Sequence, residues 1–262
     1  MKSSLKKKFL DHGYLTLKNF LSSNEKSIIK EVIYENFKKN ITLLSKSKFD
    51  LEDENFHKKI ILFRKKNPKK FGETYDNINL NSRFRSIFHT KKYLNLFAKT
   101  LNTSINQIHL TGFMMRFDTP YDKRNNLGWH QDASPYMQSA PKFRGGVCWC
   151  PVTNNSEKNG TVIYVPKSHS KYIKAKATRK KISYSKQYMI NLSKKEFDAK
   201  KNLTQNFGDL ALLHINIKHR SGENSSNKVR ITTGVRFADM SKSFNSGKEH
   251  YIFNQPKYQF QY

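Results

Sequence analysis

The chain has 262 residues, 36% of them hydrophobic and 13% aromatic, which is enough for one large domain with a substantial core. Its formal net charge is +29, and 39 of its 49 basic residues are lysines spread along most of the chain. Proteins that bind nucleic acid usually concentrate positive charge on one face or arm, because phosphate contacts need local density. The even spread disfavours nucleic acid as a partner and favours compositional bias, with a basic surface for anionic substrates as the alternative.

The sequence lacks the marks of a secreted or membrane protein. Its first 15 residues are basic without the apolar stretch of a secretory signal, and no run approaches the ~20 apolar residues that span a bilayer. We therefore expect a cytoplasmic protein. Cys148 and Cys150 are the only cysteines, and two thiols without further partners make a poor metal site, so we expect both to be buried and reduced.

Helical patterns dominate the N-terminal part, residues 1–105. Ser22 stands three residues before Glu25, the spacing of a capping box, and apolar residues follow at helical spacing as far as Leu44. This pattern predicts a helix over 22–44 that packs against a sheet.

The pattern then changes along the chain. Residues 13–20 alternate like a short strand, residues 45–80 are too polar and irregular to assign, and a second helical pattern covers 83–101. Between residues 106 and 240 there are five strand-like runs separated by turn residues: QIHLTGFMMRFD, GGVCWCPV, GTVIYVP, LALLHINI and VRITTGVRF. These runs predict a closed or sandwiched β structure.

A basic segment, residues 171–202, interrupts the strand-like runs. It is either a solvated excursion between strands or a lid or wall over a site. Residues 241–262 follow the last run as a tail. Because there is no internal repeat and no long linker, we predict one domain over residues 1–262.

The stretch GWHQDAS at 128–134 holds the first candidate for chemistry. On a strand or at its end, residues i and i+2 point the same way, so His130 and Asp132 can present an imidazole and a carboxylate to one ion. The spacing alone is weak evidence, because nine histidines and 20 acidic residues in 262 produce ~0.7 such pairs by chance. A metal site needs a third ligand from elsewhere.

His219 is the candidate for that ligand. It follows an apolar run, with Ser221 two residues and Arg230 eleven residues beyond it. Two histidines and a carboxylate fill one face of the octahedron around non-haem Fe(II) and leave three positions for a bidentate co-substrate and dioxygen. An arginine offers a planar fork that suits a carboxylate of such a co-substrate.

Two motifs contain these residues: HQD at 130–132 and H-x-S-x-x-N-x-S-x-x-x-R at 219–230. Three further landmarks accompany the motifs, namely HGYLTLKNFLSSNEK at 12–26, CWCPVTNNSEKNGTVIYVPKSH at 148–169 and FGDLALLH at 207–214. Together they cover most of the chain, and in this order they resemble the phytanoyl-CoA dioxygenase family of Fe(II)- and 2-oxoglutarate-dependent oxygenases.

The resemblance implies a mainly β, α+β fold, with a double-stranded β-helix (jelly-roll or cupin-like) core and N-terminal helices packed outside. It implies that His130, Asp132 and His219 are the catalytic ligands of Fe(II). It also implies that Arg230 binds the distal carboxylate of the co-substrate 2-oxoglutarate and that Ser221 is a second contact. Dioxygen is the other co-substrate.

Five more residues are candidates for contacts in such a site. Thr111 and Trp149 lie where the family contacts 2-oxoglutarate, although a core position suits Trp149 equally well. Arg116, Gln131 and Arg236 are candidates for substrate contact, and for Arg236 a structural ion pair is an equal alternative.

Two other histidines are expected to be structural. His214 lies five residues before His219, so the two face opposite sides of a regular strand. His169 matches a family position that is not a ligand. Lys167 replaces the family's glycine nearby, which leaves the geometry of that turn open.

The sequence thus predicts an oxygenase that hydroxylates an unactivated C–H bond of a small metabolite, with release of succinate and CO2. The basic charge balance favours an anionic substrate, and retention of Asp132 favours hydroxylation over halogenation. The alternatives are a 2-oxoglutarate-dependent nucleic-acid demethylase, a barrel that has lost iron, and a non-enzymatic basic nucleic-acid-binding protein. The identity of the substrate and the oligomeric state stay open.

Overall fold

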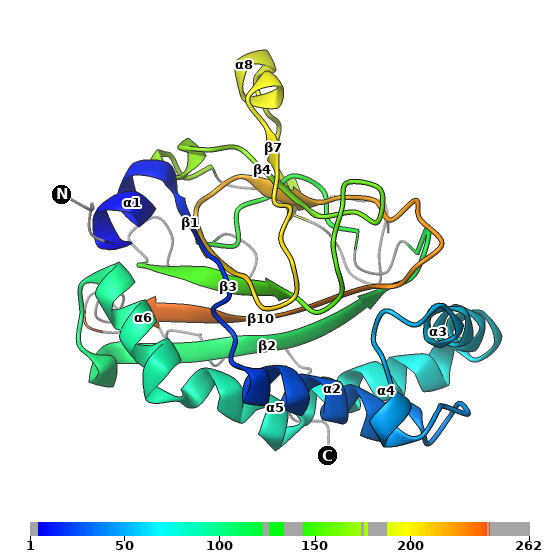
Figure 1. Cartoon of the computed structure of the whole chain (residues 1–262). Coiled ribbons are helices and arrows are strands. Elements are labelled where there is room, and N and C mark those ends of the chain that lie inside the picture. Colours follow the sequence, from blue (N-terminus) through cyan, green and yellow to red (C-terminus); the bar gives the residue numbers. More distant parts are fainter. Residues whose placement is uncertain are drawn as a thin grey trace.

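Two facing antiparallel sheets and a layer of helices build the protein (Figure 1). The computed structural model describes residues 5–122, 126–133, 144–173, 176–177, 188–239 and 241. The predicted tail at 241–262 lies outside these residues except for Ser241. Residues 174–175 and 178–187 of the basic segment lie outside them too.

The major sheet has five strands in the order β1-β8-β3-β10-β2, and all neighbours are antiparallel. The strands are β1 (Tyr14–Leu17), β8 (Leu210–His214), β3 (Gly145–Pro151), β10 (Arg230–Asp239) and β2 (Ile108–Asp118). This order places strands side by side that are far apart in the sequence, as jelly rolls do.

The minor sheet lies across the inner face of the major sheet and has the order β7-β4-β9. Its strands are β7 (Lys201–Asn202), β4 (Val162–Tyr164) and β9 (His219–Ser221). A further pair, β5 (Lys176–Ala177) and β6 (Tyr188–Met189), lies in the basic segment.

Helices cover the outer face of the major sheet, as Figure 1 shows for α2, α4, α5 and α6. The α-helices are α1 (Leu5–His12), α2 (Ser23–Phe37), α3 (Glu54–Lys66), α4 (Pro68–Leu80), α5 (Ser82–Ser86), α6 (Lys91–Leu101) and α8 (Lys194–Asp198). Short 3-10 turns occupy Lys46–Lys48, Ile87–His89, Ile105–Gln107 and Ser168–Ser170. No helix in the described part of the chain is long and apolar enough to cross a membrane.

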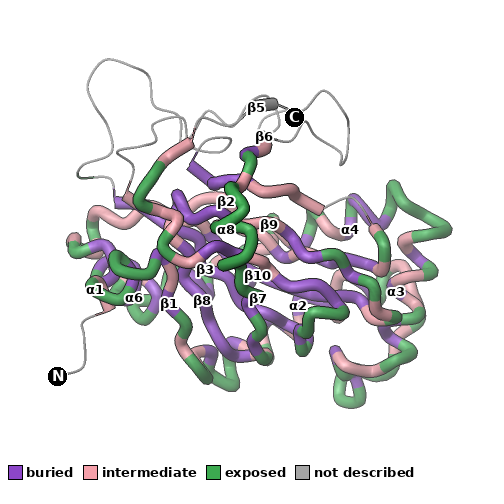
Figure 2. Tube along the Cα trace, turned by 90° about the horizontal axis from the view of Figure 1, so that it is seen from above, coloured by how far each residue is buried: buried purple, intermediate pink, exposed green. Residues whose placement is uncertain are grey.

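The main core lies between the helices and the outer face of the major sheet. Phe97 of α6 stacks on Phe237 of β10 with ring centroids 4.4 Å apart, and Phe37 of α2 meets Phe117 of β2 at 5.0 Å. Each such buried side chain stabilises the fold by about 1.5–3 kcal/mol. Strands β3, β8 and β10 are buried along most of their length (Figure 2), because helices cover one face and the minor sheet covers the other. The predicted β core with helices outside is confirmed.

Because side chains alternate along a strand, the residues of β10 between those core positions face the minor sheet. Arg230 and Arg236 belong to this inner set, and each contacts an aspartate there, Asp118 and Asp132 respectively. Strand β10 therefore turns charged side chains toward the barrel interior and apolar side chains toward the helices.

The capping box at Ser22 is confirmed, but the helix that it starts is shorter than predicted. The Ser22 amide donates to Glu25 at 2.6 Å, and the Glu25 amide donates to the Ser22 hydroxyl at 3.2 Å. Helix α2 ends at Phe37 instead of Leu44. The turn that follows is anchored by the Asn40 side chain, which donates to Thr74 of α4 at 2.9 Å, so tertiary contacts override the continuing apolar periodicity.

Residues 45–80, which the sequence left unassigned, contain α3 and α4. Both helices carry recognisable start signals, since Asp53 caps α3 by accepting from the Phe56 amide at 2.7 Å and Pro68 opens α4. The helix predicted over 83–101 is divided into α5 and α6 by a 3-10 turn. Cys148 and Cys150 are buried and free, as expected.

Candidate active site

His130 and His219 lie side by side because their backbones pair across the barrel. The amide of His130 donates to the carbonyl of His219 at 2.9 Å, and the amide of His219 donates to the carbonyl of His130 at 3.0 Å. This bridge joins the segment that contains Asp132 to β9 of the minor sheet. The fold thereby assembles the three side chains that the sequence nominated as metal ligands.

The three side chains offer their ligand atoms to a common point. One such atom from each of His130, Asp132 and His219 lies within 4.8 Å of the others, and this is the cluster of three metal-ligating side chains found among the described residues. Nε2 of His130 is 3.4 Å from Oδ1 of Asp132, and the two imidazole centroids are 4.2 Å apart. These separations suit ligands of a single ion.

The backbone selects which nitrogen of each histidine faces that point. Nδ1 of His130 is 2.7 Å from the carbonyl of Gly128, and Nδ1 of His219 is 3.0 Å from the carbonyl of Ile217. Because a carbonyl can only accept, Nδ1 carries the proton in both rings and the Nε2 lone pair is left for a metal. Such hydrogen bonds orient histidine ligands and raise their basicity.

The protonation states also suit a metal ion. Burial, assisted by the neighbouring His130, lowers the pKa of His219 to about 4, so this imidazole is neutral at neutral pH. Burial by itself raises the pKa of the Asp132 carboxyl, but the charge of the neighbouring Arg236 holds it well below its usual range. Two imidazoles that each present Nε2 and one carboxylate are the donor set of non-haem Fe(II) sites, so the residues present fit this metal.

The model of the family described as phytanoyl-CoA dioxygenase (PhyH) matches residues 9–232, most of the chain. The chain belongs to the phytanoyl-CoA dioxygenase family. It is an Fe(II)- and 2-oxoglutarate-dependent oxygenase that uses dioxygen, as the resemblance implied.

Solved structures with the same fold are distant in sequence. The non-heme monooxygenase ThoJ in its apo form is 16% identical, with a TM-score of 0.59 over 90% of this chain and 77% of that chain. The epimerase SnoN in complex with Fe3+, alpha ketoglutarate and nogalamycin RO is 13% identical, with a TM-score of 0.60 over 90% and 82%. EvdO2 from Micromonospora carbonacea var. aurantiaca, complexed with 2-oxoglutarate, is 12% identical, with a TM-score of 0.61 over 95% and 97%. At these identities the likeness shows the jelly-roll fold, and a comparison with curated proteins finds no significant match.

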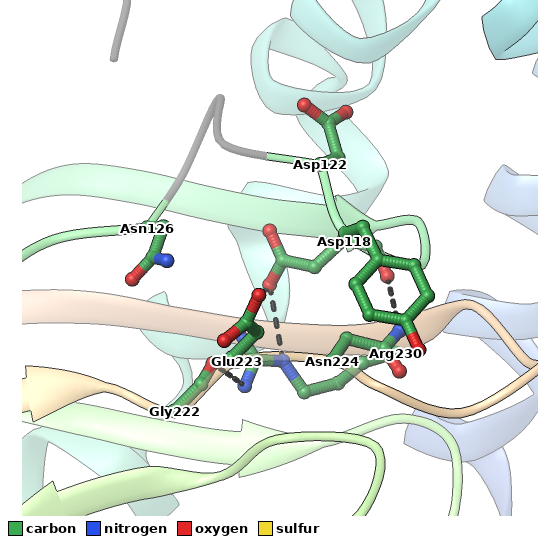
Figure 3. A pocket seen from close by; sticks show the side chains of 8 residues that line it. Asp118, Asp122, Asn126, Gly222, Glu223, Asn224 and Arg230 are labelled. Carbon is green, nitrogen blue, oxygen red and sulfur yellow. Dashed lines mark hydrogen bonds and ion pairs between the residues drawn. The ribbon is translucent and has the colours of Figure 1, made fainter. Parts of the chain in front are cut away.

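In this family member, Arg230 lies at the other end of the barrel interior and already contacts a carboxylate (Figure 3). Its Nε and Nη2 donate to Oδ2 of Asp118 at 3.1 and 2.6 Å, and its Nη1 donates to the Gly222 carbonyl at 3.3 Å. Ser221 lies close by, because its hydroxyl accepts from Nη2 of Arg116 at 3.4 Å. The structure thus gathers Arg230, Ser221 and Arg116 around Asp118.

Arg236 lies at the metal end of the same strand. Its Nε is 3.4 Å from Oδ2 of Asp132, while Oδ1 of that carboxylate faces His130. A β-bulge between Gly234 and Arg236 shifts the register with β2, where Arg236 pairs with Thr111. Next to Thr111, Gly112 adopts a φ of +59°, and a Cβ there would lie 2.5 Å from Nη1 of Arg236, so only glycine leaves room for the guanidinium.

The structure places the side chain of Gln131 among backbone groups, and its predicted substrate contact stays a prediction. This side chain is fully buried, and its amide nitrogen donates to the carbonyls of Asn216 and Lys171 at 2.5 and 2.7 Å. Its amide oxygen accepts from the backbone of Ile173 at 2.8 Å. Because Gln131 lies between the two ligands His130 and Asp132 in the sequence, its side chain points the other way, into the backbone that it anchors.

Trp149 occupies a packing position. Its indole is buried in a small apolar cluster between the two sheets, with Tyr164, Leu213 and Ile217 among its members. This arrangement agrees with the core alternative, and a contact of Trp149 with 2-oxoglutarate stays a prediction.

His214 and His169 are not part of the cluster of metal-ligating side chains. His214 packs against Phe9 and His169, and its Nδ1 accepts from the Asn216 amide at 3.1 Å. Lys167 adopts a φ of +60°, so a lysine occupies the left-handed region that favours glycine.

Two features of the site escaped sequence analysis. Asp118 shares a strand face with Arg116, but its pairing with Arg230 depends on the β2–β10 register across 112 residues. The basic segment contributes Ile190, whose amide donates to the Trp129 carbonyl at 2.9 Å beside His130. Ile190 thus lies next to the metal end, and the role of the segment, a wall over the site or a solvated excursion, stays a prediction.

Proposed function

We propose that His130, Asp132 and His219 bind Fe(II) in this oxygenase and that the enzyme hydroxylates an unactivated C–H bond of a small anionic metabolite. In the overall reaction substrate, 2-oxoglutarate and dioxygen become hydroxylated substrate, succinate and CO2. The observation that carries the proposal is the convergence of the three ligand atoms within 4.8 Å, with both Nδ1 atoms facing carbonyls. When bound there, Fe(II) supplies the redox-active Lewis acid that activates dioxygen.

The side chains of this chain position the reactants. His130 and His219 present Nε2, and Asp132 presents Oδ1 while Arg236 holds its Oδ2. Arg230, with Ser221 nearby, supplies a cationic fork for the distal carboxylate of 2-oxoglutarate. Binding both ends of the co-substrate fixes its orientation relative to the metal ligands.

The charges of the barrel interior support an anionic substrate. Three arginines, Arg116, Arg230 and Arg236, face two aspartates, Asp118 and Asp132. With a divalent metal ion added, the interior carries more positive charge than the two carboxylates of 2-oxoglutarate neutralise. The surplus favours a substrate with a negative group.

The basic segment supports exclusion of water from the site. Met189 packs over Gly128, where an added Cβ would lie 2.4 Å from the Met189 methyl, and Ile190 is buried beside it. Helix α8 is tied to the barrel by an ion pair between Glu196 and the buried Lys218, the residue before His219. Met189 and Ile190 thus cover one side of the metal end.

Anaerobic titration with Fe(II) and 2-oxoglutarate tests the proposal. The wild-type protein is expected to develop a metal-to-ligand charge-transfer band in the visible, and His219→Ala is expected to lose it. His214→Asn, a substitution of a half-buried histidine outside the cluster, is the matched control and should keep the band. An absent band in the wild type, or an unchanged band in His219→Ala, would refute the ligand assignment. Succinate production across a set of anionic and neutral metabolites then tests the substrate class.

A further inference from the structure

The pocket around Arg230 contains an acidic residue that a carboxylate-binding site does not require. We infer that Asp118 competes with 2-oxoglutarate for Arg230 and so lowers the affinity of the enzyme for its co-substrate. This inference rests on the proposed role of Arg230.

The contacts place Asp118 directly on the binding edge of the guanidinium. Oδ2 of Asp118 accepts from both Nε and Nη2 of Arg230, at 3.1 and 2.6 Å, so one full edge of the fork is occupied. Figure 3 shows the carboxylate and the Gly222 carbonyl on different sides of the same guanidinium. A second carboxylate can bind Arg230 only by displacing Asp118 or by lying next to it.

The surroundings make both routes costly. Arg230 and Asp118 are both buried, 5% and 6% exposed, so water screens their charges weakly. Nη2 of Arg116 is 3.6 Å from the same Oδ2, so displacing Asp118 weakens two cationic contacts. Lying next to Asp118 instead brings two carboxylates within a few ångströms of each other in a weakly screened site.

The competition acts only on ligands that need Arg230. A 2-oxo acid without a distal carboxylate leaves the Asp118–Arg230 pair as it is, whereas 2-oxoglutarate must displace Asp118 or lie next to it. Asp118 is thus a positioning residue that holds the guanidinium in place and weakens the binding of ligands with a distal carboxylate.

The same pocket offers a matched control. Asp122 also lines it, but its carboxylate accepts from Arg64, at 2.7 Å from Nε and 3.4 Å from Nη2. Asp122→Asn therefore removes one negative charge from the pocket without freeing Arg230.

The experiment measures binding of 2-oxoglutarate and of 2-oxobutyrate to the Fe(II)-loaded protein by anaerobic calorimetry. In Asp118→Asn, 2-oxoglutarate is expected to bind at least about tenfold more tightly than in the wild type, because a like charge beside the ligand is removed. Its affinity for 2-oxobutyrate should stay within about twofold, and Asp122→Asn should resemble the wild type for both ligands. Equal or weaker 2-oxoglutarate binding in Asp118→Asn, or equal tightening for both ligands, would overturn the inference.

Two outcomes separate the inference from other failures. If the wild type and both variants bind no 2-oxoglutarate, the proposed function fails and this inference fails with it. If Asp118→Asn does not fold unaided, because Arg230 is left buried without its counter-ion, refolding is compared with 2-oxoglutarate and with 2-oxobutyrate. Recovery with 2-oxoglutarate alone supports the inference, and recovery that does not distinguish the two ligands contradicts it.

Discussion

At the metal end of the barrel, formed by His130, Asp132 and His219, backbone carbonyls orient the two imidazoles and a backbone bridge sets their separation. At the co-substrate end, Arg230 and Asp118 mainly hold each other through their side chains. Backbone hydrogen bonds of the barrel cannot change without unfolding part of it, whereas a side-chain ion pair can exchange partners. The difference teaches that this fold builds a rigid site for the proposed metal and an exchangeable one for the proposed co-substrate carboxylate.

Removal of the metal-binding carboxylate is the largest expected effect at the metal end. Asp132→Ala takes away one of three ligands, so Fe(II) should bind at least about 100-fold more weakly, the loss expected for a ligand or a group that supports one. Metal titration monitored by fluorescence quenching checks this, with Asp122→Asn as the control. Unchanged Fe(II) affinity would show that Asp132 is not a ligand.

Substitution of Arg230 is expected to weaken binding of 2-oxoglutarate without changing binding of Fe(II). Arg230→Gln removes the charged fork, and 2-oxoglutarate should bind about 100-fold more weakly, since breaking a buried charge pair costs about 3 kcal/mol or more. Arg230→Lys keeps the charge without the planar fork, so its affinity for 2-oxoglutarate should lie between those of the wild type and Arg230→Gln. In both variants the Fe(II) dissociation constant should stay within about twofold of the wild type, because that end is set by backbone contacts. Parallel loss of metal affinity would show that the two ends are not independent.

Acid should lower the free energy of unfolding through His57, which contacts the backbone next to Arg230. This residue of α3 accepts from the Val229 amide at 3.1 Å, directly before Arg230, and burial followed by the charge of Lys228 lowers its pKa from 6.5 to about 4. Between these values the unfolded chain binds more protons than the folded one, so stability is complete above about pH 6.5 and is lost as the pH falls toward about 4.

The substitution that isolates this effect is His57→Asn, whose side-chain oxygen can accept from Val229 but does not titrate. Urea unfolding at pH 7, 6 and 5 should show a slope of stability against pH that is smaller by up to about 1.4 kcal/mol per pH unit in the variant. His214, with a pKa lowered by burial to about 3, contributes a slope of the same sign in both proteins. Identical slopes would exclude His57 as the titrating group.

The smallest expected effect concerns the support of the metal end. Arg236→Gln removes the contact to Oδ2 of Asp132, and Fe(II) should bind about tenfold more weakly, as for other groups that orient a ligand. Gly112→Ala should act in the same direction, because its Cβ would lie 2.5 Å from the Arg236 guanidinium. Arg236→Lys should recover part of the loss. Unchanged metal affinity in all three would leave the predicted contact with the substrate as the role of Arg236.

Local signals in the sequence were sufficient for much of the fold. The capping residues at Ser22 and the strand alternation around Arg230 report interactions within a few residues, so they could be recognised without a structure. The end of α2 could not, because it depends on Asn40 contacting Thr74 from another helix. Asp53 and Pro68 show that α3 and α4 had readable start signals inside a stretch that looked irregular.

The sequence by itself determined the three metal-ligand candidates and the arginine, because their motifs lie in short segments whose spacing reflects a strand or its end. Tertiary structure alone decided the partners of these residues. Whether Arg230 contacts Asp118 depends on the register of two strands, because the two residues are 112 positions apart in the sequence. Whether the Gln131 side chain contacts substrate or backbone depends on which segment of the fold packs against it, here the one that contains Asn216. Register and facing surface are set by the packing of the whole barrel, which no local pattern contains.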